Sequence, residues 1–137
     1  SRGDNSGTHK MELSLWEKNQ VDVSTVSGTW YREVGAGMGA TLNIAAGMNA
    51  YTLVDRATWS SFKNKAAHKI LFQGDPILFN QYGVIAVSPQ RHPHIKADLA
   101  DQFIGWLISD KGQRAILNFT IEGQSVFTPN ASKIPLR

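Results

Sequence analysis

The first ten residues, SRGDNSGTHK, are rich in groups that donate hydrogen bonds. Ser6 is a suitable N-cap, so the amides that follow it would lack partners inside the helix that it starts. Gly7 lets a ligand approach this backbone closely, and the Thr8 hydroxyl adds a rotatable donor. Arg2 supplies a planar, charged fork of donors from the preceding turn. Donors gathered at the positive end of a helix dipole predict an anion site.

A second glycine-rich stretch, GAGMGAT at residues 35–41, precedes another predicted helix at residues 40–48, which Gly47 is expected to end. Its glycines would allow the backbone N–H groups to form a concave array, with Gly39 and Ala40 at the start of the helix. A tight turn before a helix explains the same glycines without any ligand. Because the stretch follows the first loop by one structural unit, Gly39 and Ala40 are included among the predicted anion contacts.

Other motifs indicate different chemistries and are less complete. The string RGD marks integrin recognition only on a protruding loop, and the glycine spacing near the start does not match a phosphate-binding P-loop. His92 and His94 could hold a metal, but an exposed Pro-containing turn explains them, and no carboxylate or cysteine accompanies them. Ser6 and His9 have nothing nearby to orient the histidine as a base. We therefore predict no metal, no cofactor and no enzymatic activity.

The spacing of apolar residues predicts the architecture. Residues 50–55, 69–73 and 82–89 are expected to be strands, and the last is a nearly continuous apolar run typical of a buried central strand. Residues 97–108 show a clear helical face, and residues 112–119 form a further predicted helix. The alternation indicates an α/β fold with a mostly parallel sheet flanked by helices. Ligands of such folds bind where strands end and helices begin, where both glycine-rich loops lie.

Composition excludes several classes of function. The 137 residues carry 14 Lys and Arg against 11 Asp and Glu, and the net charge of +3 is scattered along the chain. No segment combines a basic stripe with aromatic side chains, so nucleic acid is not an expected partner. The absence of cysteine excludes disulfides. No apolar run approaches the ~20 residues that cross a bilayer. Since the chain starts without Met, we expect a fragment or processed form.

Several segments, taken in order, carry a resemblance to a known family. SRGDNSGTH, GMGATL, AYTLVDRATW, GDPILFNQYGVIAVSP and GQSVFTPNA resemble the second half of the tungstate-binding periplasmic proteins of ABC transporters, within the type II periplasmic-binding-protein superfamily. The resemblance implies two hinged α/β lobes that hold the ligand between them. It also implies that the oxyanion is contacted by Arg2, Ser6, Gly7 and Thr8, with Ser1 as a further candidate.

The resemblance further implies how the chain divides. Residues 1–79 would form most of the second, anion-binding lobe. Residues 80–137 would contain a crossover strand and C-terminal helices that pack on the first lobe, whose N-terminal part is absent. We expect the uncovered apolar face to cause self-association. A membrane ABC permease is the implied partner, and the implied location is periplasmic or extracytoplasmic, at the membrane through that permease.

The opening loop also bears on which oxyanion is bound. Tungstate, molybdate and sulfate are acceptor-only dianions near neutral pH, whereas monohydrogen phosphate carries a proton that an Asp can accept. Asp4 could be that acceptor, but a role in the turn or as the partner of Arg2 is favoured. Together with this role of Asp4, the resemblance implies tungstate or molybdate as the ligand. A phosphate- or sulfate-type binding protein and a non-transport anion-sensing domain of a regulator remain alternatives.

Overall fold

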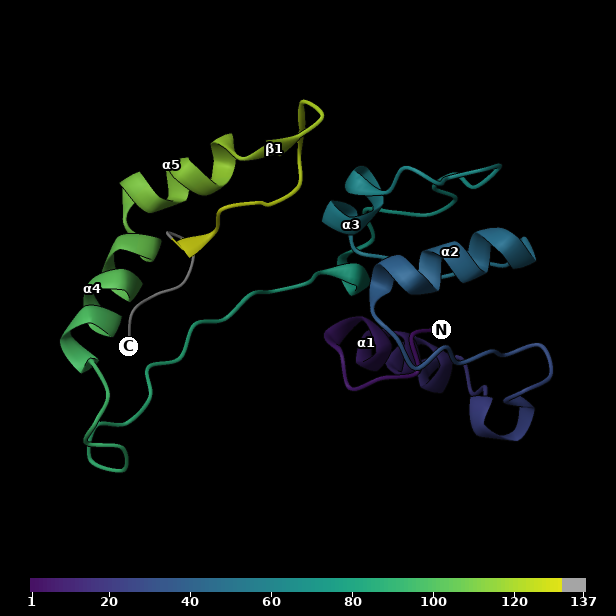
Figure 1. Cartoon of the computed structure of the whole chain (residues 1–137), viewed down its shortest axis with the longest axis horizontal. Helices are drawn as coiled ribbons and strands as arrows, with labels where there is room; N and C mark the ends of the chain where they lie inside the picture. Colours follow the sequence, from purple (N-terminus) through teal and green to yellow (C-terminus); the bar gives the residue numbers. More distant parts are fainter. Residues whose placement is uncertain (132–137) are drawn as a thin grey trace. The chain divides into compact units, whose positions relative to one another are not determined.

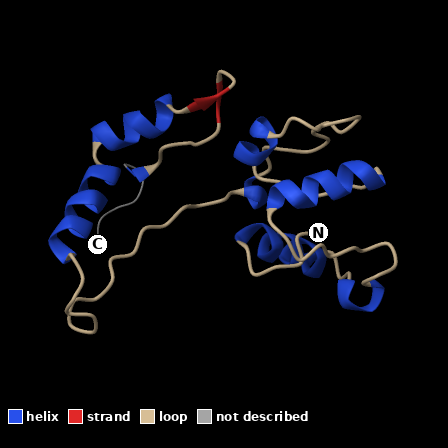
Figure 2. Ribbon diagram, viewed as in Figure 1, coloured by secondary structure: helices blue, strands red, loops and turns tan. Residues whose placement is uncertain are grey.

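The computed structural model describes residues 1–131 of the chain. It divides into two compact units, Ser1–Phe79 and Asn80–Arg137, and each is described by itself. Figure 1 traces both units along the sequence, and Figure 2 shows that helices and loops make up most of the described chain. No helix in residues 1–131 combines the length and the apolar character needed to cross a membrane.

The first unit is built from short helices that begin at side-chain caps. Its elements are α1 (Gly7–Lys18), the 3₁₀ turn η1 (Val23–Val26), α2 (Met38–Met48), α3 (Arg56–Ser61) and the 3₁₀ turn η2 (Pro76–Leu78). Each of these except α2 has an N-cap residue whose side-chain oxygen accepts a backbone N–H from within the element. The N-cap residues are Ser6, Asp22, Asp55 and Asp75 respectively. Such caps are local, which is why the sequence locates these helix starts.

The core of the first unit centres on one face of α2. Thr41 and Leu42 are almost fully buried, at 1% and 2% exposure. They share that face with Met38 and Ala45, at the spacing of successive helical turns. The helix ends at Asn49, whose left-handed backbone (φ 51°) forms the C-cap. The prediction that Gly47 ends the helix is therefore wrong, because asparagine also tolerates this conformation.

The second unit contains α4 (Ala97–Ile108), α5 (Asp110–Asn118) and a hairpin of β1 (Thr120–Ile121) with β2 (Gln124–Ser125). Ser109 stands between the two helices and caps the start of α5 by accepting the Gly112 amide at 3.2 Å. Within residues 80–131, the only buried residue is Gly112, and no large apolar side chain is buried. This unit therefore lacks an apolar core of its own in the described chain.

The mostly parallel sheet predicted from the sequence is not formed by residues 1–131. Their only sheet is the antiparallel β1–β2 pair, in which Thr120 faces Ser125. Residues 50–55, 69–73 and 82–89 have no strand assignment, and Figure 2 draws the last stretch as loop. Ile85 within it is 91% exposed. A strand exists only with a hydrogen-bonded neighbour, and the described residues supply none to these segments.

Candidate functional site

The start of α1 leaves two backbone donors available. Ser6, in extended conformation, accepts the His9 amide on its side-chain oxygen at 3.2 Å, and its carbonyl oxygen accepts the Lys10 amide at 3.0 Å. The Gly7 and Thr8 amides have no acceptor within residues 1–131. The predicted N-cap is thus confirmed, and it leaves two N–H groups at the positive end of the helix dipole.

Arg2 and Asp4 form an ion pair beside this helix start. Arg2 Nη2 lies 2.5 Å from Asp4 Oδ2, and the Arg2 side chain is only 20% exposed. The other carboxylate oxygen, Oδ1, accepts both the Ser6 amide (3.2 Å) and the Ser6 hydroxyl (2.5 Å). The expected role of Asp4 as turn-former and partner of Arg2 is confirmed. Arg2 therefore folds back onto the loop, and the negative charge of Asp4 is compensated.

These contacts also affect the protonation of Asp4. The hydrogen bond from the Ser6 side chain is the largest cause that lowers the pKa of the Asp4 carboxyl, and Arg2 adds to the effect. Partial burial opposes it by raising the pKa. At neutral pH the carboxylate is ionised, with each of its oxygens already accepting a hydrogen bond.

The three candidate hydroxyls differ in what they can still donate. Ser6 gives its hydrogen to Asp4, so it would have to leave Asp4 to contact an anion. Thr8 Oγ1 makes no hydrogen bond within residues 1–131, and the residue is half-buried. Ser1 Oγ accepts the Gly3 amide at 3.3 Å and lies 3.1 Å from His9 Nδ1. Thr8 is therefore the hydroxyl that is most readily available.

The second glycine-rich loop is bonded directly to the first. The Gly35 and Ala36 amides both donate to the Arg2 carbonyl oxygen, at 2.7 and 3.3 Å. The Val34 amide donates to the Ser1 carbonyl oxygen at 3.1 Å. The prediction that Gly35 contributes its N–H to a concave array is wrong, because that N–H is used between the loops. The sequence carries no signal for this pairing, since the partners lie more than thirty residues apart.

The helix after the second loop retains free donors. It starts at Met38, two residues earlier than predicted, with Gly37 as an N-cap that has no side chain to contribute. The amides of Gly39 and Ala40, in its first turn, have no acceptor within residues 1–131. The Thr41 hydroxyl donates to the Gly37 carbonyl oxygen at 3.1 Å and supports this turn from the core. Both loops of the candidate site therefore end in unpaired N–H groups.

Aromatic side chains pack near the first unit's loops. Trp16 on α1, Trp30 and Tyr31 make edge-to-face contacts with ring centroids 5.6 to 6.4 Å apart. Tyr31 is 4% exposed, and burial raises the pKa of its hydroxyl. Trp30 remains 58% exposed. Part of the cluster is therefore core, which fixes the position of the segment that bonds to the opening loop.

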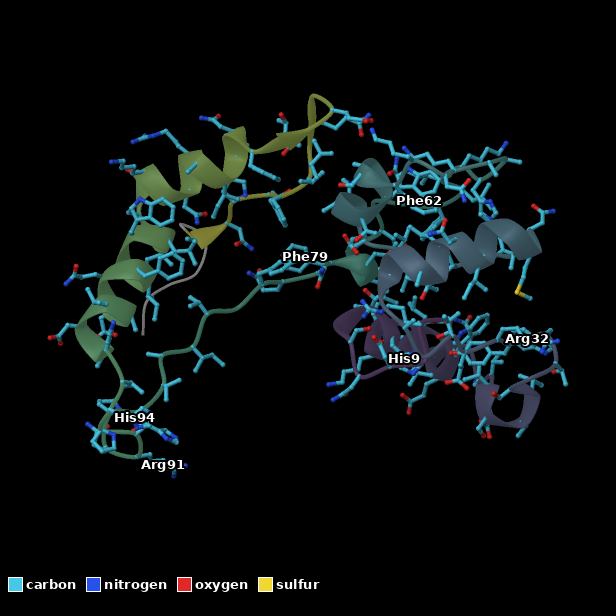
Figure 3. The ribbon with its side chains drawn as sticks, in the orientation of Figure 1. His9, Arg32, Phe62, Phe79, Arg91 and His94 are labelled. Carbon is cyan, nitrogen blue, oxygen red and sulfur yellow. The ribbon has the colours of Figure 1, made fainter. Side chains whose placement is uncertain are left out.

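The other candidate motifs do not form a metal-binding or catalytic cluster in residues 1–131. The His92 and His94 rings face each other edge to face, with centroids 6.1 Å apart, and residues 1–131 contain no group of three or more potential metal ligands. Figure 3 shows His94 and Arg91 together on this loop of the second unit. Arg56 donates to Gln73 Oε1 at 2.7 Å, away from the opening loop.

Comparisons with known proteins identify the family and several relatives of this chain. The family described as PBP superfamily domain matches residues 1–111. A tungstate-binding protein, TupA, from Peptoclostridium acidaminophilum is 44% identical over 97% of this chain, and TupA from Campylobacter jejuni is 36% identical over 96%. Among solved structures, the tungstate-binding protein TupA of Desulfovibrio alaskensis G20 is 45% identical and superposes with a TM-score of 0.74 over 95% of this chain.

These findings define the class of the protein. The chain belongs to the PBP superfamily and has its fold. Relatives in both comparisons are named tungstate-binding proteins, which confirms the family resemblance carried by the five sequence segments. The chain spans about half the length of the relatives it matches, 46% and 49% of the two TupA proteins above and 53% of the solved structure.

Proposed function

We propose that this chain forms the anion-capturing part of a substrate-binding protein that delivers tungstate to an ABC permease outside the cytoplasm. The observation that carries the proposal is the Arg2–Asp4 ion pair beside the unpaired Gly7 and Thr8 amides. A guanidinium, a free hydroxyl and helix-start amides are donors suited to an oxyanion. The names of the tungstate-binding relatives support the choice of ligand.

The state of Asp4 supports an acceptor-only dianion over hydrogen phosphate. The proton of hydrogen phosphate needs an acceptor in the site, and Asp4 is the carboxylate of the opening loop. Its Oδ1 already accepts two hydrogen bonds from Ser6, and its Oδ2 accepts one from Arg2. Tungstate or molybdate needs only donors, because all of its oxygens accept. The proposed ligand is therefore tungstate, with molybdate as the chemically closest alternative.

Capture between two lobes would complete the site. Residues 1–79 would be most of the anion-binding lobe, and residues 80–137 would pack on the other lobe. That other lobe would correspond to the part of the relatives that this chain does not cover. Two observations support this: the described part of the second unit buries no large apolar side chain, and the apolar run at residues 82–87 is exposed. Strands of the other lobe would pair with that run and make the mostly parallel sheet. Lobe closure would then remove water from the anion.

Calorimetric titration of tungstate into the full-length protein tests the proposal. Arg2→Ala removes the guanidinium and also leaves Asp4 unpaired, so affinity should fall by at least the ~1.5–3 kcal/mol of one charge-assisted hydrogen bond. That is a loss of about 10- to 150-fold in Kd. Arg56→Ala is the matched control, because Arg56 contacts Gln73 outside the site. Equal affinities of native protein and Arg2→Ala would contradict the proposal.

A further inference from the structure

His9 connects the opening loop to the segment before α2. Its side chain is 12% exposed, and it lies in the first turn of α1, as Figure 3 shows. Its Nδ1 is 3.1 Å from Ser1 Oγ, and its Nε2 is 4.0 Å from Glu33 Oε1. The ring therefore has one nitrogen on a candidate anion ligand and the other near a carboxylate.

The backbone of Ser1 is held by hydrogen bonds, so the hydroxyl is the group of this residue that can change its hydrogen-bond partners. The Ser1 nitrogen donates to the Arg32 carbonyl oxygen at 2.8 Å, and the Ser1 carbonyl oxygen accepts the Val34 amide at 3.1 Å. The hydroxyl oxygen has two lone pairs and one hydrogen. The Gly3 amide takes one lone pair at 3.3 Å. The second lone pair and the hydrogen remain for His9, for a ligand and for the buried Tyr31 hydroxyl, which also interacts with the Ser1 side chain.

The protonation of His9 decides which of these Ser1 can offer. Without a hydrogen on Nδ1, the ring accepts the Ser1 hydroxyl hydrogen, and Ser1 has no hydrogen left for an anion. With a hydrogen on Nδ1, the ring donates to the second lone pair of Ser1 Oγ. Both lone pairs are then filled, and the hydroxyl hydrogen can be donated to the anion. A hydrogen on Nε2 would at the same time face the Glu33 carboxylate, whose Oε1 lies 4.0 Å away.

We propose that oxyanion capture is linked to proton uptake by His9, which makes Ser1 a hydrogen-bond donor to the anion. The inference rests on the proposed function, since that anion is the ligand. His9 acts through Ser1 and is a positioning residue. Glu33 is its counter-ion and is itself held by the Ser27 hydroxyl, which donates to Glu33 Oε2 at 2.9 Å. The proton comes from solvent and stays on the imidazole while the anion is bound.

The other titratable groups around the His9 ring are paired, neutral or in contact with other residues. Arg2 and Asp4 in the opening loop neutralise each other in their ion pair. Tyr31, on the segment before α2, is neutral near pH 7, and burial raises the pKa of its hydroxyl further above its usual range. Glu12, one turn along α1, acts on Tyr31 and receives the Trp16 indole N–H at 3.4 Å. Glu33 thus provides the negative charge beside the ring, and an arriving dianion adds to it.

The same residue types occur in hydrolases, but the contacts differ here. The distance from His9 Nε2 to Glu33 Oε1, 4.0 Å, is longer than a hydrogen bond. Ser1 Oγ already accepts the Gly3 amide. The arrangement therefore suits the placement of one hydroxyl hydrogen better than the activation of a nucleophile.

The experiment is a tungstate titration of the full-length protein by calorimetry, in buffers of equal pH and different ionisation enthalpy. Native protein should take up part of one proton per anion near neutral pH, and its affinity should fall at high pH by up to about tenfold per pH unit. His9→Asn places an amide near the position of Nδ1. It can still donate to Ser1, so binding should persist without proton uptake and without this pH dependence.

A second variant separates the hydrogen bond from mere packing. His9→Gln moves its amide toward the position of Nε2 and loses the contact with Ser1. Its affinity should fall as far as that of Ser1→Ala, and the double variant should lose no more than either single change. A double variant whose losses simply add would show that the two residues act independently and would overturn the inference.

The outcomes distinguish a failure of the His9 proposal from a failure of the proposed tungstate-binding function. Native protein that binds tungstate without proton uptake overturns this inference alone, as does uptake that persists in His9→Asn. Native protein that binds no tungstate at any pH contradicts the proposed function as well. The proton count needs only the native protein, so it decides the question even where a variant fails to fold.

Discussion

The Gly35 amide donates to the Arg2 carbonyl oxygen at 2.7 Å. This bond joins the loop that starts α1 to the loop that starts α2, and the Ala36 amide reinforces it on the same oxygen. The residue that carries the guanidinium is thereby attached to the start of a second helix. Two helix N-termini and one charged side chain are held by backbone contacts, so their spacing does not depend on flexible side chains.

Replacement of Gly3 should separate these loops. Gly3 has a left-handed backbone (φ +61°), and a Cβ there would lie 2.6 Å from the Glu33 Cβ. Gly3→Ala should therefore destabilise the full-length protein by about 1–3 kcal/mol and weaken tungstate binding. Thermal unfolding and calorimetry measure the two effects. Gly47→Ala is the control: it lies inside α2 with open space around it, and should stabilise by up to about 1 kcal/mol with unchanged affinity. Equal behaviour of the two variants would contradict the loop contact.

Asp4 should contribute a pH-dependent part of the stability. Its pKa in the folded state lies below the ordinary value of 3.8, chiefly through the Ser6 hydroxyl. A depressed carboxyl pKa stabilises the fold above pH 3.8, and this stabilisation is lost as the pH falls through the folded-state value. Thermal unfolding against pH should show a steeper acid loss for native protein than for Asp4→Asn. Parallel curves for the two proteins would refute this role.

The corner between α4 and α5 should require glycine. A Cβ on Gly112 would collide with the Trp106 carbonyl oxygen and lie 2.8 Å from that of Leu107. Gly112→Ala should lower the stability of the full-length protein by about 1–3 kcal/mol, because backbone atoms cannot move aside cheaply. Gly105→Ala, within α4 and with open space around its Cβ, should be neutral or slightly stabilising. Chemical denaturation of the native protein and of the two variants measures the difference. A Gly112→Ala variant as stable as Gly105→Ala would contradict the prediction that this corner requires glycine.

The exposed apolar run at residues 82–87 should drive association of the 137-residue chain by itself. Ile85 is 91% exposed and lies beside an open groove of about 220 Å³ lined largely by apolar side chains of α4 and its own segment. Ile85→Lys should shift the chain toward monomer in sedimentation velocity, since a charge there opposes apolar contact. Gln90→Lys carries the same change of charge on the neighbouring exposed loop and should leave association unchanged. A native chain that stays monomeric at high concentration would contradict the prediction.

The features that could be predicted from the sequence are those with local causes. The Ser6 cap, the helix from Ala97 to Ile108 and the Arg2–Asp4 pair each depend on residues a few positions apart. The tungstate-binding resemblance followed from five short motifs, each of contiguous residues. Local patterns decide caps and helical faces, so these predictions could succeed.

The features that could not be predicted depend on distant partners. Residues 82–89 have the composition of a buried strand, but a strand needs a neighbour that residues 1–131 do not provide. The bond of Gly35 to Arg2 and the contact of His9 with Ser1 place residues on separate segments together. Asn49 rather than Gly47 ends α2, because both residue types tolerate the left-handed backbone and the periodicity does not choose between them.

The position of tungsten in crystals of the full-length protein grown with tungstate tests the central claim most directly. Anomalous scattering locates this heavy atom independently of the protein model. We predict one strong peak whose surrounding oxygens lie within hydrogen-bond distance, about 3 Å, of the Arg2 guanidinium and of the Gly7 and Thr8 amides. A strong peak elsewhere, with Arg2 still paired only to Asp4, would contradict the account.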